Sequence, residues 1–160
     1  MTRKKVVVPI DGSDFSLQVL PTITEMFEPA QTELILLHVA PEPEVIELEP
    51  GDPEMTFYVD QQEAGLRANF ADDMLPQVRR LEKAGFAAST AMRFGEPTEE
   101  IERFIADESV DLVAMTTHGR TGLARMMFGS VAEHVLHHSK APIMLYRSFA
   151  NGTPEKGATA

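Results

Sequence analysis

Five short apolar runs, each about as long as a β-strand, constrain the fold of this chain more than any other feature. They occupy residues 5–10, 33–39, 86–93, 111–116 and 142–147. The strongest of these runs are continuously apolar rather than alternating, which is typical of strands covered on both faces. The pattern therefore predicts a parallel sheet that is buried between two other layers.

Between the runs, apolar residues recur at intervals of three or four, the period of a helix that packs along one side. The clearest sets are Leu17, Leu20, Ile23 and Phe27; Leu66, Phe70, Met74, Val78 and Leu81; Ile101, Phe104 and Ile105; and Val131, Val135 and Leu136. Strands therefore alternate with helices. Right-handed crossovers then give an α/β fold, a doubly wound five-stranded parallel sheet with helices on both faces.

Some segments interrupt this alternation. Pro21 and Pro76 lie within periodic stretches, and each predicts either a kink or a helix that begins later than the pattern. Residues 41–56 are rich in proline and glutamate and are predicted to be a loop. We expect one domain over residues 1–147 and a flexible tail over 148–160.

Composition narrows the classes of function. The 160 residues carry 25 acidic and 14 basic side chains, a formal net charge of −11, which repels nucleic acid and anionic membranes. Cysteine is absent, so disulfides and thiolate metal sites are excluded. No apolar run approaches the ~20 residues of a membrane span, and the first run is too short for a signal peptide. We therefore expect a soluble, cytoplasmic protein.

The segment after the fourth run is the main candidate for a ligand site. Residues 117–130 contain three glycines and end in Ser130, where a helix is expected to begin. Glycine turns and helix N-termini expose backbone N–H groups to an anion, and Arg120 and Arg125 would add positive charge. The same composition also fits a loop that only turns the chain into its last helix. Neither a P-loop nor a dinucleotide-binding glycine motif is present.

Four segments and their spacing carry a resemblance to a known family. They are VPIDGSD (8–14), LLHVAP (36–41), DLVAMTTHGRTGL (111–123) and FGSVAEHVLHHSKAPIMLYR (128–147). Over residues 3–147 the chain resembles the universal stress protein family. This resemblance implies an adenine nucleotide alpha hydrolase-like fold and, by a conserved glycine pattern in the ATP-binding members, a site for ATP or another adenine nucleotide.

That glycine pattern is Gly, two residues, Gly, nine residues, Gly, then Ser or Thr. Gly119, Gly129 and Ser130 match it, but Thr116 stands at the first glycine. A positive φ at that position would be costly for a β-branched residue. With a negative φ the threonine is tolerated, and its hydroxyl could donate to a ligand.

The resemblance also implies roles for individual residues. Asp11 would contact the ribose and adenine end, the main chain at Val39 would meet the base, and the start of the last helix would donate to the phosphates, with Mg²⁺ held mainly by those phosphates. The predicted set is Pro9, Asp11, Val39, Met115, Thr116, Gly119, Arg120, Gly129, Ser130 and Val131. Arg120 is included for its charge alone. The alternatives are a turn role for Asp11, core burial for Val39 and a solvated loop for Arg120.

The histidines give weaker signals. His134 and His138 have the i, i+4 spacing of metal ligands, but the sequence shows no third ligand nearby, so an exposed pair is favoured and no metal site is predicted. His38 is expected to be buried and hydrogen-bonded, and His118 to lie in a loop.

These patterns predict a nucleotide-binding regulatory protein of the stress response. Without a nucleophile–base–acid set, any ATP hydrolysis would be slow and incidental, so the chain is not predicted to be an enzyme. The alternative is a protein–protein interaction module with a vestigial pocket, which Thr116 favours. The resemblance implies a homodimer through residues 142–147, predicted as an edge strand, and a regulatory protein partner is also expected.

Overall fold

The computed structural model describes residues 3–43, 53–119 and 129–149. Its strands are β1 (Lys4–Pro9), β2 (Thr32–Ala40), β3 (Ala87–Phe94), β4 (Leu112–Gly119) and β5 (Ile143–Phe149). Its α-helices are α1 (Leu20–Met26), α2 (Pro53–Lys83), α3 (Pro97–Asp107) and α4 (Ser130–His138), and the short 3₁₀ helices are Ser16–Val19 and Pro29–Gln31. Each strand falls on one of the five apolar runs.

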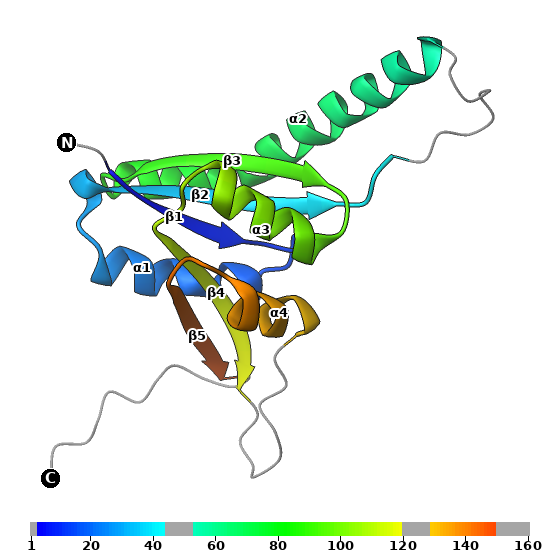
Figure 1. The fold of residues 1–160 in the computed structure, drawn as a ribbon. Helices are drawn as coiled ribbons and strands as arrows, with labels where there is room; N and C mark the ends of the chain where they lie inside the picture. The colour runs from blue at the N-terminus through cyan, green and yellow to red at the C-terminus, as the bar shows by residue number, and fades with distance from the viewer. Residues whose placement is uncertain (1–2, 44–52, 120–128, 150–160) are drawn as a thin grey trace, which may run out of the picture.

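The sheet is parallel throughout and has the order β3-β2-β1-β4-β5. The chain first winds outward from β1 to β3, then returns to the other side of β1 and winds outward again to β5 (Figure 1). This is the doubly wound α/β fold that the sequence predicts.

Two hydrophobic cores cover the two faces of the sheet. Alternate residues of each strand point to opposite faces, so Val6 and Val8 pack with α1 and α2, whereas Val7 packs with α3 and α4. Figure 1 shows α3 and α4 on one side of the sheet. The continuous apolar runs of the sequence are therefore the consequence of two covered faces.

The two internal prolines have different outcomes. Pro21 lies in the first turn of α1, where a backbone N–H would have no acceptor within the helix, so proline removes no hydrogen bond. The periodic stretch around it begins with the 3₁₀ helix Ser16–Val19, so the α-helix starts later than the apolar pattern. Pro76 lies inside α2, which continues from Pro53 to Lys83.

Three boundaries differ from the predictions. The segment 41–56 is not a loop throughout, because α2 begins at Pro53. Strand β4 continues to Gly119, because its last residues pair with β5 as far as Gly119↔Phe149. Ser148 and Phe149 therefore belong to the sheet and not to a tail, while residues 150–160 lie outside the described residues.

Helix α2 is longer than the sheet that it covers. Its 31 residues span about 46 Å, whereas the nine residues of β2 span about 30 Å. Figure 1 shows its first turns projecting beyond the strands. Of the helices described, none has the length and apolar character needed to cross a membrane.

Candidate functional site

Strand β1 pairs very differently with its two neighbours. It is in register with β2 over its whole length, from Lys4↔Thr32 to Pro9↔Leu37. With β4 it pairs only at Val6↔Leu112 and Val7↔Val113. The two strands therefore separate toward their carboxyl ends, at the point where the strand order reverses. That is the position where doubly wound sheets bind ligands.

Pro9 lies where this separation begins. The backbone groups of successive strand residues face alternate neighbours. On the β4 side, Lys5 N–H donates to Asp111 Oδ2 at 2.8 Å, and Asp111 N–H donates to Lys5 O at 2.9 Å. On the β2 side, Ile10 N–H donates to Leu37 O at 2.8 Å. The backbone of Pro9 therefore faces β4, beyond the last residue pair. Because β4 is not paired there, the missing N–H of Pro9 costs the sheet no hydrogen bond.

A cavity of about 460 Å³ lies at the carboxyl ends of β1, β2 and β4 and reaches the start of α4. It is lined by most of the predicted site residues: Pro9, Asp11, Val39, Met115, Thr116, Gly129, Ser130 and Val131. Gly119 ends β4, where it pairs with Phe149. Arg120 and Arg125 lie outside the described residues. The sequence pattern missed the apolar wall formed by Pro97 and Ile101 of α3.

Asp11 is held in the turn that follows β1. Its Oδ1 accepts hydrogen bonds from the Ser13 hydroxyl at 2.5 Å and from the Ser13 N–H at 3.0 Å. The Ser13 hydroxyl is the main cause that lowers the pKa of this carboxyl, which partial burial opposes. The turn role considered for Asp11 is therefore confirmed. The side chain is also exposed at the rim of the cavity, so it remains available to a ligand.

Thr116 does not strain the backbone. Among the described residues, the only non-glycine residue with positive φ is Ser109, so Thr116 adopts its extended conformation without that penalty. Its hydroxyl donates to the backbone O of Ser16 at 3.3 Å, on the α1 face of the sheet. Glycine is therefore not required here by the conformation of the chain.

Thr117 is a further residue of the cavity wall that the sequence pattern missed. Strand alternation places it on the face of Val113 and Met115, and its side chain lines the cavity. It is only 7% exposed, and its Oγ1 has no hydrogen-bond partner. Because a buried hydroxyl without a partner is costly, a rotation about χ1 that turned this hydroxyl into the cavity would let it bind a polar group of a ligand.

The start of α4 presents unpaired backbone donors to the same cavity. Gly129 is the N-cap residue and provides no side-chain cap, and the first intrahelical bond runs from Glu133 N–H to Gly129 O at 2.9 Å. The amides of Ser130 and Val131 therefore precede the helical ladder. A Cβ at Gly129 would meet nothing within 4 Å, and its φ is −58°. Neither the backbone nor the packing of the described residues requires glycine at that position.

His38 borders the cavity from β2. Its Nδ1 donates to Ile10 O at 2.9 Å, and its ring stacks on Phe70 of α2 with 5.3 Å between the centroids. The predicted hydrogen bond is confirmed, although the side chain is half-buried rather than buried. The side chain of His118 lies outside the described residues.

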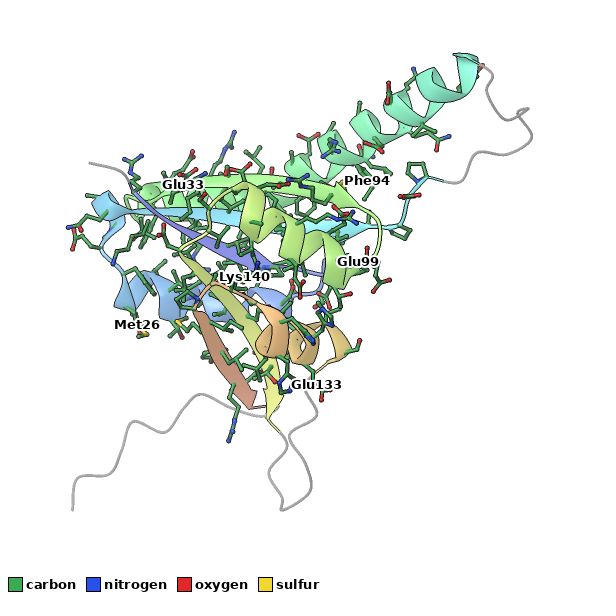
Figure 2. All side chains as sticks on the ribbon, in the orientation of Figure 1. Met26, Glu33, Phe94, Glu99, Glu133 and Lys140 are labelled. Atoms are coloured by element: carbon green, nitrogen blue, oxygen red, sulfur yellow. The ribbon has the colours of Figure 1, made fainter. Side chains whose placement is uncertain are left out.

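The expectation for His134 and His138 was wrong in one respect. A third potential ligand, Glu102, comes from α3, which packs beside α4. The sequence did not reveal it because it lies 32 positions before His134, on another helix. Glu133, which precedes His134 in the sequence, is exposed; it is labelled on α4 in Figure 2.

Comparison with known proteins places this geometry in context. The model of the universal stress protein family matches residues 2–147. Universal stress protein MJ0531 of Methanocaldococcus jannaschii is 30% identical over 146 residues, which cover 90% of this chain and 82% of the relative.

Solved structures show the same fold. MJ0577 of Methanocaldococcus jannaschii superposes with a TM-score of 0.69 at 26% identity, covering 94% of this chain and all of that one. A universal stress protein in complex with cAMP has a TM-score of 0.60 at 20% identity and covers 92% of this chain and 98% of its own. A family protein of Arabidopsis thaliana with AMP bound has a TM-score of 0.61 at 18% identity, with coverage of 96% and 97%.

Proposed function

Because this chain belongs to the universal stress protein family, we propose that it binds an adenine nucleotide, ATP above all, in the cavity between the carboxyl ends of β1 and β4. The observation that carries the proposal is the meeting, in one cavity, of the unpaired amides of α4 with the turn that holds Asp11. Two solved relatives of the same fold are complexes with cAMP and with AMP.

The two ends of the cavity suit the two ends of a nucleotide. Apolar side chains, among them Val39, Ile101 and Met115, provide a wall against which a base can pack. Asp11 offers a carboxylate to ribose hydroxyls, and the main chain at Val39 offers polar groups to the edge of the base. The base end is therefore recognised by shape and by a few polar contacts.

The phosphate end is served by main-chain donors rather than by charged side chains. The amides of Ser130 and Val131 point out of the start of α4, where the helix dipole favours an anion. The open space beside Gly129 would let phosphate oxygens approach the backbone closely. Thr117 Oγ1, buried and without a partner, would gain a hydrogen bond from the bound nucleotide if rotation about χ1 turned it into the cavity.

We propose that the nucleotide acts as a signal rather than as a substrate. The described parts of the chain bring no nucleophile and general base together at the cavity, so any hydrolysis of ATP would be slow and incidental. Mg²⁺ would accompany ATP and be held mainly by the phosphates. The nucleotide would then shift the populations of two states of the protein by its difference in affinity for them, and a regulatory protein partner would distinguish those states.

A homodimer through β5 is part of the same proposal. This strand lies at the edge of the sheet, and its residues from Ile143 to Tyr146 are half-buried rather than covered. An uncovered edge with apolar side chains favours pairing with a second chain. Light scattering at micromolar concentration is expected to give the mass of a dimer, and a monomer mass would contradict this part.

The nucleotide proposal is tested with the purified chain and a matched pair of variants. Isothermal titration with ATP, AMP and cAMP, with and without Mg²⁺, is expected to show binding at one site per chain. Gly129→Ala places a methyl group where the phosphates would lie and is expected to weaken binding at least tenfold, about 1.4 kcal/mol. Gly65→Ala, in open space on α2, is the control and should leave binding unchanged.

A wild-type chain that binds no adenine nucleotide at millimolar concentration would refute the proposal. Nucleotide identified by mass after heat denaturation of the purified protein would support it. Thr116→Gly separates it from the vestigial-pocket alternative. Because Thr116 is unstrained, we expect the same affinity in the variant, whereas binding that appears only with glycine would favour the vestigial pocket.

A further inference from the structure

A second group of chemically capable side chains lies away from the nucleotide cavity, between α3 and α4. Glu102 comes from α3, and His134 and His138 come from α4. One potential ligand atom from each lies within 4.8 Å of the other two. We propose that these three side chains bind a divalent transition-metal ion, for which Zn²⁺ is the best match.

The helices that carry these residues are fixed by the core. Ile101 and Ile105 of α3 and Val135 of α4 are buried in the same apolar cluster, so the positions of the two backbones do not depend on the polar group. His134 and His138 are one helical turn apart and share one face of α4. Their rings stack with 4.2 Å between the centroids and an interplanar angle of 21°. The ligands are therefore presented by a rigid scaffold.

His138 has the hydrogen bond that is typical of a metal ligand. Its Nδ1 donates to the backbone O of His134 at 2.9 Å. Because a carbonyl oxygen only accepts, the proton of the neutral ring is on Nδ1, and the lone pair is on Nε2. Metal-ligating histidines commonly have their other ring nitrogen anchored in this way.

Among the described residues, the carboxylate of Glu102 has one close partner, His134 of α4. Its Oε1 is buried and accepts no well-directed hydrogen bond, although His134 Nε2 is only 2.9 Å away. The neighbouring Arg103 is engaged with Glu99 and Glu100. Ligand atoms around a tetrahedral Zn²⁺ ion are about 3.3 Å apart. To bind one ion, Glu102 and His134 would move apart by about 0.4 Å, and the widest separation in the cluster, up to 4.8 Å, would shrink by as much as about 1.5 Å.

The donor set selects the class of metal. Two imidazoles and one carboxylate suit Zn²⁺ and its neighbours in the first transition series, whereas Mg²⁺ and Ca²⁺ prefer oxygen ligands alone. Three protein ligands leave at least one coordination position open. A surface cavity of about 650 Å³, lined by Glu102 and His138 among others, has room for water or a small anion to complete the coordination.

The test uses the full chain without an affinity tag, stripped of metal by a chelator and free of nucleotide. Competition with a chromophoric chelator is expected to show one Zn²⁺ per chain. With Co²⁺ as the probe, visible absorption bands of a four- or five-coordinate site are expected. Glu102→Gln and His138→Ala should each lower the Zn²⁺ affinity at least tenfold. His137→Ala, an exposed histidine of the same helix outside the cluster, should not change it.

The proposal fails if the wild-type chain binds Zn²⁺ no more tightly than His138→Ala, or if His137→Ala is equally harmful. A Glu102→Gln variant that loses thermal stability while the wild-type protein shows no response to Zn²⁺ would identify the cluster as an ion pair only. Far-UV circular dichroism of each variant establishes that the fold is intact. Because Glu102→Gln preserves shape and His138 is exposed, both variants keep the comparison interpretable.

Discussion

The two sides of β1 differ more than any other pair of neighbouring regions in the molecule. Toward β2, the strand is paired along its full length, and the residues there, such as Leu34 and Leu36, are fully buried. Toward β4, pairing ends at Val7, and polar side chains such as Asp11 and Thr117 surround a cavity. One side of the central strand therefore contributes mainly to stability, and the other borders the candidate site.

This difference follows from what each side must satisfy. Apolar side chains gain stability from close packing, and the backbone gains from an unbroken ladder. A ligand needs unpaired donors and open space, which reduce the stability of the empty protein. A single strand can serve both needs because its backbone groups face alternate neighbours.

We call the β2 side of β1, where pairing is complete, the closed side, and the β4 side the open side. The largest expected effect on stability is at the closed side. Leu36→Ala removes a fully buried side chain and is expected to lower the free energy of unfolding by about 3–4 kcal/mol. Met115→Ala, at the open side, is expected to cost only about 2 kcal/mol, because the space it leaves is continuous with the cavity. Urea unfolding of both variants measures the contrast. Equal losses of unfolding free energy in the two variants would contradict the difference in packing between the two sides of β1.

The second effect separates two adjacent residues of β4. Thr117→Val removes the unpartnered hydroxyl and is expected to raise the free energy of unfolding of the empty protein by about 1 kcal/mol, while weakening nucleotide binding. Thr116→Val removes a hydrogen bond to Ser16 and is expected to lower the free energy of unfolding by about 0.5–1 kcal/mol. Thermal unfolding without ligand, followed by titration with ATP, measures both. A destabilised Thr117→Val would show that its hydroxyl has a partner after all.

The smallest effect concerns the pH dependence of the open side. The hydrogen bonds from Ser13 lower the pKa of Asp11 below its usual 3.8. A carboxylate with a depressed pKa in the folded state stabilises the protein above the unfolded pKa, and this contribution is lost as the pH falls through the folded pKa. The difference in urea midpoint between wild type and Asp11→Asn should therefore be constant from pH 7 to 5 and shrink below pH 4. A difference that grew on acidification would contradict the assignment.

The fold was predictable because its main determinant is local. Each buried strand needs a continuous apolar run, and each run is visible in the sequence. The ends of the elements were less predictable, because they depend on pairing with distant segments. The polar residues after Thr116 resemble a loop, yet they continue β4 because β5 offers them a ladder. The helix that begins at Pro53 similarly lies within a segment whose composition favours a loop.

The candidate site was predictable where glycines and a turn mark it, and not elsewhere. Glycine-rich turns indicate anion sites by their backbone, so Gly129 and Ser130 could be found from the sequence. Thr117 could not be found from the sequence, because the two adjacent threonines look alike there. In the structure, the pleat of β4 turns the Thr116 side chain toward Ser16, where it has a hydrogen bond, and turns Thr117 to the other face, where it has none. Glu102 was missed for a related reason, since its approach to His134 depends on how α3 packs on α4.

Pro9 has a consequence for how the proposed nucleotide would enter the cavity. Continued hydrogen-bonded pairing of β1 with β4 would use a backbone N–H at this position, and proline has none. Proline at this position therefore removes one hydrogen bond that would favour closure of the gap between the two strands. Because β1 and β4 are unpaired beyond Val7, a nucleotide entering there would not have to separate paired strands, and that cost would not reduce its affinity.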